Sequence, residues 1–318
     1  MYYIIVNPSS KSGRGTQIWQ DLEQIFLERE IPYKVTTTTH VGHVKEITSN
    51  ITNTEETVNL IILGGDGTIN EALQGIRDFS KVKIGYIPTG SSNDLARSMK
   101  LPKNPREILE KILSGENAHM VDLGKLTYLG HTDTPSRLHQ TIDSPSRYFV
   151  VSSGIGFDAA VCEEALSSRI KNLFNKLKLG KLTYLGIALK QLFTAKAVSC
   201  DLYLDDKPPI HLNRFLFVAS MIHPYEGGGF MFGPNADAGD GLLDICVIGG
   251  LPKLFILLAL PTAYFGNHFI FPKIFAYRTS KLEIKTSVPL WVHTDGEVYF
   301  QSDHIYLSCE QQKVHFLA

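Results

Sequence analysis

The sequence of 318 residues has almost no net charge, few cysteines and no uninterrupted apolar run of membrane-spanning length. Its 31 basic and 32 acidic residues leave a formal charge of -1, so no surplus of positive charge favours nucleic acid as a partner. The four cysteines are scattered and match neither zinc-site nor disulfide spacings, which favours a reduced, cytoplasmic protein. The opening M-Y-Y-I-I-V-N-P lacks a basic start and predicts a first strand rather than a signal peptide.

Three common nucleotide-binding signatures are also missing. No G-x-x-x-x-G-K-[ST] segment occurs, and the protein-kinase signature set is absent. The dinucleotide fingerprint G-x-G-x-x-G fails because Asn70 stands where its third glycine would be. Any nucleotide site must therefore use another arrangement.

The most informative stretch covers residues 58–74, V-N-L-I-I-L-G-G-D-G-T-I-N-E-A-L-Q. Its apolar start, its glycines and the helical spacing that follows predict a buried strand, a glycine turn and a helix. Glycine lets the backbone approach a ligand closely, and the free N–H groups at the start of a helix suit phosphate. The carboxylate of Asp66 in such a turn indicates a bound cation or a proton-transfer role, with a plain structural turn as the alternative.

Strands and helices alternate through the first part of the chain. Strands are predicted at 2–6, 33–37, 58–63 and 82–87, with helices between them, which is typical of a parallel sheet covered on both faces. A small, polar and basic loop at residues 9–15 suits phosphate oxygens or is simply solvated. A further polar glycine loop follows the fourth strand at residues 88–97. Such sheets bind ligands at the carboxyl ends of their strands, where the glycine loops lie.

From Ser146 onward, alternating apolar runs such as Tyr148–Ser152 are separated by turns and predict an antiparallel sandwich. Helices are predicted within it at 159–166 and 182–193. Residues 254–271 are strongly apolar but interrupted, so a buried helix and a membrane-docking element both fit them. The lysine-rich residues 171–181 suit anionic headgroups or a solvated face.

Six segments, ordered along nearly the full chain, resemble a known family. They are Asn7-Pro8 with Gly13-Arg14-Gly15, Gly64 to Thr68 with Asn70-Glu71, Pro88 to Asp94, Asp122 to Gly124, Asp240 to Leu243, and Asp295-Gly296-Glu297. The family is the diacylglycerol kinase catalytic domain family of bacterial soluble lipid kinases, which includes sphingosine and ceramide kinases. One departure is Ser91, where many members have threonine.

The resemblance implies two domains with a cleft between them. The first would be an NAD-kinase-like α/β domain with a parallel sheet, formed by residues 1–124 and by about 300–318 returning to it. The second would be an antiparallel β-sandwich, residues 125–299, that binds the lipid substrate.

The implied activity is that of a lipid kinase, which transfers the γ-phosphoryl group of ATP to a lipid hydroxyl with Mg²⁺ as cofactor. Diacylglycerol is the leading acceptor, although phosphatidylglycerol, a sphingoid base or an undecaprenyl-like alcohol would leave similar motifs. The alternatives are an NAD kinase and a non-catalytic lipid-binding regulator. The enzyme would act in the cytoplasm, peripherally at the inner face of the membrane, as a monomer or a homodimer.

The resemblance also implies residue roles. Glu297 would be the general base facing the nucleotide, while Asp66 and Asp94 would organise the catalytic Mg²⁺. Arg14 is a candidate cation for the phosphates, as is Lys11. The implied nucleotide contacts are Asn7, Lys11, Thr38, Gly64, Gly65, Asp66, Gly67, Thr68, Asn70, Glu71, Gly90, Ser91 and Asn93.

A second metal site is implied in the glycine-rich turn at residues 235–244. Carboxylates and turn carbonyls are the oxygen ligands that Mg²⁺ prefers, although a plain D-G hairpin turn would also explain the segment. Asp240 would give a side-chain oxygen to a structural Mg²⁺, with Asp237 and Leu242 at the flanking carbonyl positions. Asp122 would join the polar network near the passage into the second domain.

Overall fold

The structure, a computed structural model, describes residues 1–115, 118–132, 135–136, 144–167, 180–196 and 198–317. The side chains of the lysine-rich residues 171–181 lie outside the described part of the chain, so the headgroup contact predicted for them stays a prediction.

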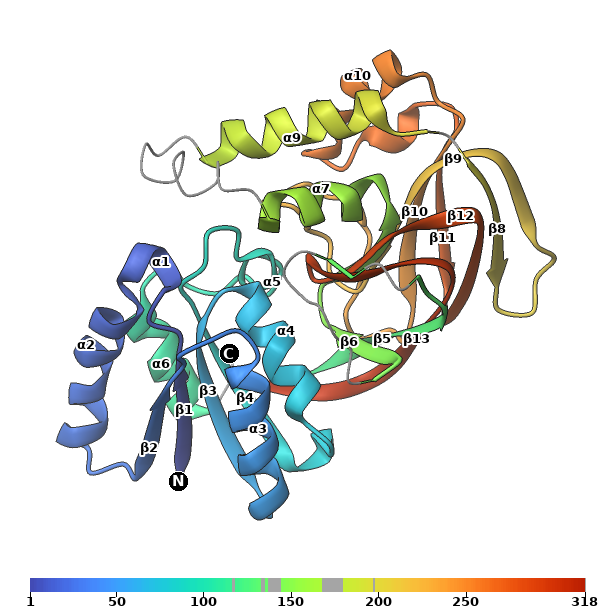
Figure 1. Cartoon of the computed structure of the whole chain (residues 1–318). Helices are drawn as coiled ribbons and strands as arrows, with labels where there is room; N and C mark the ends of the chain where they lie inside the picture. Colours follow the sequence, from blue (N-terminus) through green and yellow to red (C-terminus); the bar gives the residue numbers. More distant parts are fainter. Residues whose placement is uncertain (116–117, 133–134, 137–143, 168–179, 197, 318) are drawn as a thin grey trace.

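The N-terminal part alternates strands and helices (Figure 1). The strands β1 (Tyr2–Val6), β2 (Tyr33–Thr37), β3 (Val58–Gly64) and β4 (Val82–Pro88) pair in parallel in the order β4-β3-β1-β2. The helices are α1 (Ser10–Gly13), α2 (Gly15–Glu28), α3 (His43–Thr54), α4 (Asp66–Gly75), α5 (Asp94–Ser98) and α6 (Pro105–Ser114), with a short 3₁₀ helix, η1 (Phe79–Lys81), before β4.

Helices cover both faces of this parallel sheet, because alternate residues of each strand point to opposite sides. Ile4 and Val6 of β1 pack in one core with side chains of α2 and α6. Tyr3 and Ile5 pack in a second core with side chains of α3 and α4. The carboxyl edge of the sheet is left for the loops that follow β1, β3 and β4.

The C-terminal part is mainly antiparallel and has its own core, in which Phe215, Val292 and Ile305 are almost fully buried. Its strands are β5 (His119–Gly130), β6 (Ser146–Phe149), β7 (Ser152–Gly156), β8 (Val198–Leu204), β9 (Ile210–Met221), β10 (Leu243–Gly249), β11 (Ile274–Thr279), β12 (Lys281–Thr294) and β13 (Glu297–Leu317). Its helices are α7 (Phe157–Ser167), α9 (Gly180–Thr194) and α10 (Lys253–Ala263), followed by the 3₁₀ helix η2 (His268–Ile270).

One strand, β13, joins the two parts. It pairs antiparallel with β12 and β5, and its end, His315–Leu317, pairs in parallel with Lys83–Gly85 of β4. A single sheet of 13 strands therefore runs through the described residues. The domain limits expected at 124 and 299 fall inside β5 and β13, and they stay a prediction.

The expectation of one strand at Tyr148–Ser152 is wrong. β6 ends at Phe149 and β7 begins at Ser152. The reason is that the backbone N–H groups of Val150 and Val151 donate to the carboxylate of Asp295. The backbone of these two residues is therefore bonded to a side chain and not to a neighbouring strand.

Candidate active site

The loops after β1, β3 and β4 meet at the carboxyl edge of the parallel sheet. The backbone of Gly90 packs against Gly65, so that a Cβ atom added to Gly90 would lie 2.6 Å from the Cα atom of Gly65. Thr89 N donates to Gly64 O at 2.7 Å, and Thr89 Oγ1 donates to Ser10 Oγ at 2.7 Å. This part of the sheet, which we call the glycine edge, is thus a closely packed backbone surface around Gly64, Gly65 and Gly90. Only glycine fits at its centre.

Asp66 occupies the first turn of α4 but is directed toward α5. Its carboxylate accepts hydrogen bonds from Asp94 N at 2.9 Å, from Leu95 N at 3.4 Å and from the hydroxyl of Tyr86 at 3.3 Å. Burial raises the pKa of Asp66, while these three donors oppose the rise. Asp66 therefore fixes the start of α5, and with it the position of Asp94.

Asp94 is 5% exposed and holds a second carboxylate close to the first. It accepts from Gly228 N at 2.8 Å and from Arg97 Nη1 at 3.4 Å. Burial, together with the nearby charges of Asp66 and Glu226, raises the pKa of Asp94 to about 6 against the effect of its donors. Carboxylates kept together at this cost form a donor set that fits a divalent cation.

A two-residue hairpin turn contributes a third carboxylate, that of Asp295. Asp295 and Gly296 connect β12 to β13 with φ values of 50° and 84°, as a type I′ turn requires. The carboxylate of Asp295 accepts from Val150 N, Val151 N and Ser152 N and from Asn70 Nδ2, at 2.8–3.1 Å. Because Asn70 lies on α4, the turn is fastened directly to the helix that follows the glycine turn of β3.

Glu297, the first residue of β13, lies over this glycine turn. A Cβ atom added to Gly67 would lie 2.6 Å from Glu297 Oε1, so the carboxylate sits against the backbone of Gly67. The structure thus brings together Glu297 from the C-terminal part and the glycine edge of the N-terminal part. These are the groups on which the predicted site depends.

Other predicted nucleotide contacts are used within the protein. Both ends of the Asn70 amide are engaged, by Arg147 Nη2 at 3.1 Å and by Asp295 and Tyr148 O. Asn93 closes its loop through two hydrogen bonds to the backbone of Gly90. These arrangements stabilise the loops, and direct contact of Asn70 and Asn93 with a nucleotide stays a prediction.

The remaining predicted contacts are distributed along the same edge. Asn7 Nδ2 donates to Thr68 Oγ1 at 3.2 Å, and the side chain of Thr68 packs beneath Gly64. Thr38 is buried and its N–H donates to Val6 O at 2.9 Å. Ser91 and Arg14 are exposed, Glu71 is half-buried, and the side chain of Lys11 lies outside the described part.

The predicted structural Mg²⁺ turn is occupied by an ion pair. Arg278 contacts the carboxylates of Asp240 and Asp244, and Leu242 N donates to Asp240 Oδ1 at 2.9 Å. Asp122 accepts from Gly241 N at 2.7 Å and from Gln312 N at 2.6 Å, which ties the turn to β13. A metal held by Asp237, Asp240 and Leu242 would have to compete with the Arg278 guanidinium, and it stays a prediction.

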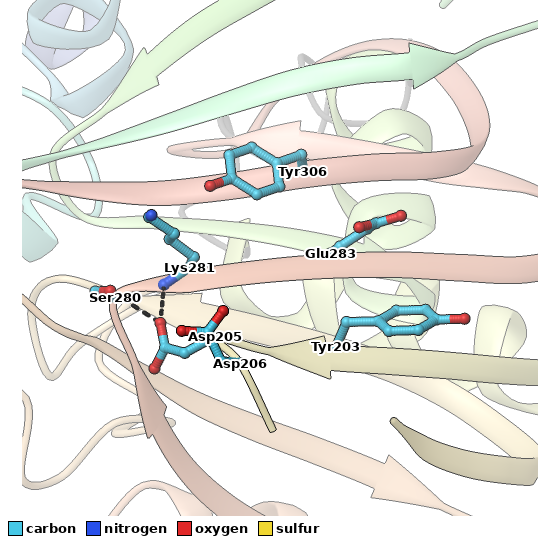
Figure 2. A pocket seen from close by; sticks show the side chains of 7 residues that line it. All are labelled: Tyr203, Asp205, Asp206, Ser280, Lys281, Glu283 and Tyr306. Carbon is cyan, nitrogen blue, oxygen red and sulfur yellow. Dashed lines mark hydrogen bonds between the residues drawn. The ribbon is translucent and has the colours of Figure 1, made fainter. Parts of the chain in front are cut away.

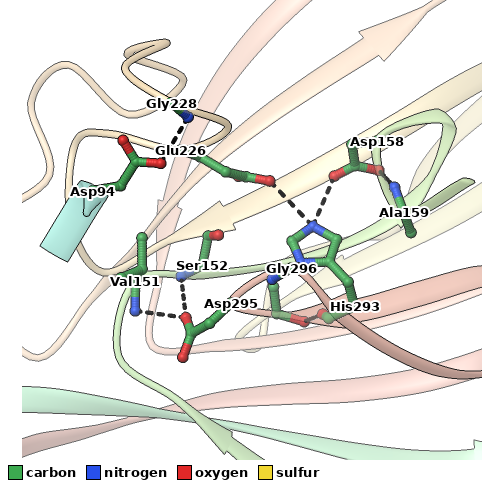
Figure 3. Close-up of polar contacts among 11 residues, drawn as sticks. Asp94, Val151, Ser152, Asp158, Ala159, Glu226, Gly228, His293, Asp295 and Gly296 are labelled. Carbon is green, nitrogen blue, oxygen red and sulfur yellow. Dashed lines mark hydrogen bonds and ion pairs between the residues drawn. The ribbon is translucent and has the colours of Figure 1, made fainter. Parts of the chain in front are cut away.

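The sequence interpretation missed a buried polar cluster beside the site. Asp158 of α7, Glu226 after β9 and His293 of β12 place their side-chain oxygen and nitrogen atoms within 4.8 Å of one another (Figure 3). The only signal was the histidine itself in H-T-D-G-E, two residues before Asp295. Asp158 and Glu226 lie far from it in sequence, so no motif spacing connected them.

A separate surface pocket contains none of the predicted site residues. It is lined by Tyr203, Asp205, Asp206, Ser280, Lys281, Glu283 and Tyr306 (Figure 2). Asp205 accepts hydrogen bonds from Ser280 Oγ and Lys281 N, so its charge is already compensated. We therefore place the candidate active site at the glycine edge.

Comparison with known proteins gives matches over both parts of the chain. Residues 1–126 match the model of the diacylglycerol kinase catalytic domain, and residues 150–305 match that of the YegS C-terminal NAD kinase beta sandwich-like domain. The chain is 25% identical over 299 residues to "Putative lipid kinase YtlR" of Bacillus subtilis, covering 93% of each chain. It is 27% identical over 239 residues to a diacylglycerol kinase of Mycobacterium tuberculosis, covering 75% of this chain and 70% of the relative.

A solved structure has the same fold over the whole length. It is described as "A putative diacylglycerol kinase from Bacillus anthracis str. Sterne" and superposes with a TM-score of 0.72. The match covers 99% of this chain and 96% of the other at 20% identity. The β-sandwich expected for the C-terminal part agrees with the family model that matches there.

We expect Asp295→Asn to destabilise the fold. In the variant, the amide N–H groups would face the backbone N–H groups that now donate to the carboxylate. The free energy of unfolding should therefore fall by about 2 kcal/mol. Burial raises the pKa of Asp295 to about 6. This is above the unfolded value near 4, so the wild type takes up a proton on folding and gains stability from Asp295 as the pH falls from 8 to 5. The loss in the variant should therefore be about 1 kcal/mol larger at pH 5 than at pH 8.

Urea denaturation at the two pH values measures both effects. Asp206→Asn, the same change at an exposed position, is the control and should leave stability unchanged. Equal stability of Asp295→Asn and the wild type would contradict the anchoring role.

Proposed function

The chain belongs to the diacylglycerol kinase catalytic domain family of lipid kinases, and from this we propose that it transfers the γ-phosphoryl group of ATP to the hydroxyl of diacylglycerol. The product would be phosphatidic acid, which places the enzyme in phospholipid metabolism. The observation that carries the proposal is the position of Glu297 against Gly67, with a carboxylate from one part of the chain facing the glycine turn of the other.

The glycine edge supports binding of ATP phosphates. Gly65 is the N-cap of α4, where unpaired N–H groups and the helix dipole favour negative charge. Asp94, held beside Asp66, supports a Mg²⁺ ion among these phosphates. Bound there, Mg²⁺ would neutralise the charge that develops on the transferring phosphoryl group.

Glu297 supports proton transfer from the acceptor. A lipid hydroxyl loses its proton as its oxygen bonds to the γ-phosphorus and the bond to the β,γ-bridging oxygen breaks, with ADP as the leaving group. A carboxylate within hydrogen-bond reach accepts that proton. The turn that carries Glu297 is fixed by Asp295, so the base is held in place before substrate arrives.

An apolar face on α10 and the residues after it supports contact with a bilayer. No helix in the described part is long and apolar enough to cross a membrane. However, Leu254, Leu258, Phe265 and Ile270 are 57–75% exposed, while Ile256 and Ala259 on the other side of α10 are buried. The predicted buried helix is thus only half buried. We propose that the exposed side inserts shallowly at the cytoplasmic surface of the membrane from which the acceptor comes.

We predict that purified protein transfers phosphate from ATP to diacylglycerol in mixed micelles and that Glu297→Ala lowers turnover by at least about 10²-fold. The measurement uses γ-labelled ATP and a panel of diacylglycerol, phosphatidylglycerol, sphingosine, undecaprenol and NAD. Labelled product from another acceptor would overturn the assignment of diacylglycerol. Wild-type turnover in Glu297→Ala would overturn the role of the base.

Gly67→Ala should lower turnover without lowering stability. The new Cβ would displace the Glu297 carboxylate, which lies at the end of a flexible side chain, so the fold is not strained. Alanine also favours the helix that begins there. We expect turnover to fall by about 10²-fold and the melting temperature to stay the same or rise. Gly186→Ala, where a Cβ meets nothing within 4 Å, is the control, and equal turnover in both variants would contradict the contact.

The bilayer face is tested by flotation with phosphatidylglycerol vesicles. Leu254→Gln, Leu258→Gln and Phe265→Gln combined should weaken vesicle binding at least about tenfold, since each removes apolar area that would be buried in lipid. Leu27→Gln, Val41→Gln and Leu129→Gln combined is the matched control, because these side chains are also exposed but lie elsewhere. Equal binding by both variants would overturn the docking face.

A further inference from the structure

The buried cluster near the site centres on His293, which is 0% exposed. Its Nε2 atom lies 3.2 Å from Asp158 Oδ2 and 3.2 Å from Glu226 Oε1. The backbone of Gly154 passes so close that an added Cβ atom would lie 1.9 Å from Asp158 Oδ2 and 2.6 Å from His293 Nε2. The three side chains are therefore enclosed by the β7 backbone and have no room to rearrange freely.

The other ring nitrogen of His293 holds the turn that carries Glu297. Gly296 N donates to His293 Nδ1 at 3.1 Å (Figure 3). A nitrogen that accepts this bond has no proton, so the ring proton lies on Nε2, between the two carboxylates. The ring thus joins Gly296, the residue directly before Glu297, to Asp158 and Glu226.

Glu226 extends the connection to the Asp94 side of the site. Its backbone closes a short loop with Phe230 through hydrogen bonds of 2.9 and 3.0 Å in both directions. The three glycines inside this loop have φ values of 64°, 85° and 113°. The middle one, Gly228, donates its N–H to Asp94 Oδ2 at 2.8 Å (Figure 3). A movement of Glu226 would therefore shift a hydrogen bond to Asp94.

We propose that His293 is a positioning residue that sets the Glu297 carboxylate relative to Asp94 by bonding Gly296 on one side and Asp158 and Glu226 on the other. The proposal rests on the proposed kinase function for the roles of Glu297 and Asp94. Two groups that must act on the same phosphoryl transfer come from different parts of the chain, and His293 lies between them. His293 is 0% exposed, so it does not itself touch substrate.

The hydrogen bond from Gly296 decides which form of the ring fits. Glu226 and Asp158 raise the pKa of His293 well above its usual value, against the effect of burial, and burial raises the pKa of Asp158. The carboxylates thus favour a proton on Nε2, which faces them, whereas the Gly296 N–H directed at Nδ1 leaves no place for a second ring proton.

The same geometry distinguishes the cluster from a metal site. Two carboxylates and a histidine could hold a divalent cation, but the metal would need the lone pair of Nε2. With Nδ1 accepting from Gly296 N, a metal on Nε2 would leave the ring without any proton. The arrangement therefore favours hydrogen bonding, and metal content becomes one outcome of the test.

Two variants of His293 separate positioning from simple core filling. In His293→Asn, the amide oxygen can replace Nδ1 and keep the Gly296 bond but cannot reach the carboxylates. In His293→Gln, the longer amide can reach Asp158 and Glu226 but does not accept from Gly296. Turnover with ATP and diacylglycerol, the KM for ATP, the melting temperature and bound metal by mass spectrometry are measured for both.

We expect His293→Gln to lower kcat by about 10²-fold with the KM for ATP within about threefold of wild type, and His293→Asn to retain at least about tenfold more kcat than His293→Gln. Equal or higher kcat in His293→Gln would overturn the proposal. Stoichiometric metal in the wild type that is lost in both variants would also overturn it.

A second measurement does not depend on activity. Long-range ¹H–¹⁵N spectra of the wild type, with His293 assigned by its loss in His293→Asn, should show a neutral ring protonated at Nε2. A proton on Nδ1 would overturn the proposal. If the wild type phosphorylates no lipid, the proposed function fails, while the spectra still decide whether His293 binds the Gly296 N–H.

Discussion

The candidate active site depends on one strand that belongs to both parts of the molecule. β13 begins at Glu297, pairs with β12 and β5, and ends beside β4 of the parallel sheet. The position of Glu297 over Gly67 is therefore fixed by the hydrogen-bond register of a continuous sheet, and Asp295 fastens the same turn to α4 through Asn70. Without these bonds, nothing would hold the Glu297 carboxylate, the proposed base, at a fixed distance from the glycine edge.

This arrangement buries several carboxylates, and burying their charge costs free energy. Burial raises the pKa values of Asp66, Asp94, Asp158 and Asp295, because each loses water that would solvate its charge. Asp295, Asp66 and Asp94 recover part of the cost through backbone N–H donors. Asp94 also lies close to the negative charge of Glu226, and a cation bound with ATP would offset their repulsion. Strained electrostatics of this kind is common where a protein must bind a charged ligand.

The sequence predicted the features that local chemistry determines. Apolar periodicity indicated β1 to β4 and their helices, and the glycine loops at residues 64–67 and 90 do meet at one edge. It could not predict the break at Val150, because the acceptor for that N–H is Asp295, far along the chain. The exposed side of α10 was equally hidden, since every residue of 254–260 is apolar and no period marks a face. His293, Asp158 and Glu226 come from three distant segments, so only the folded chain brings them together.

A crystal structure of the protein with a non-hydrolysable ATP analogue and Mg²⁺ tests the proposed roles of the glycine edge and Glu297 most directly. We expect the γ-phosphate against the backbone of Gly65 and Gly67, Mg²⁺ beside Asp94, and the Glu297 carboxylate on the open side of the γ-phosphate. Phosphates bound away from the glycine edge, or a Glu297 carboxylate directed away from the nucleotide, would contradict these roles.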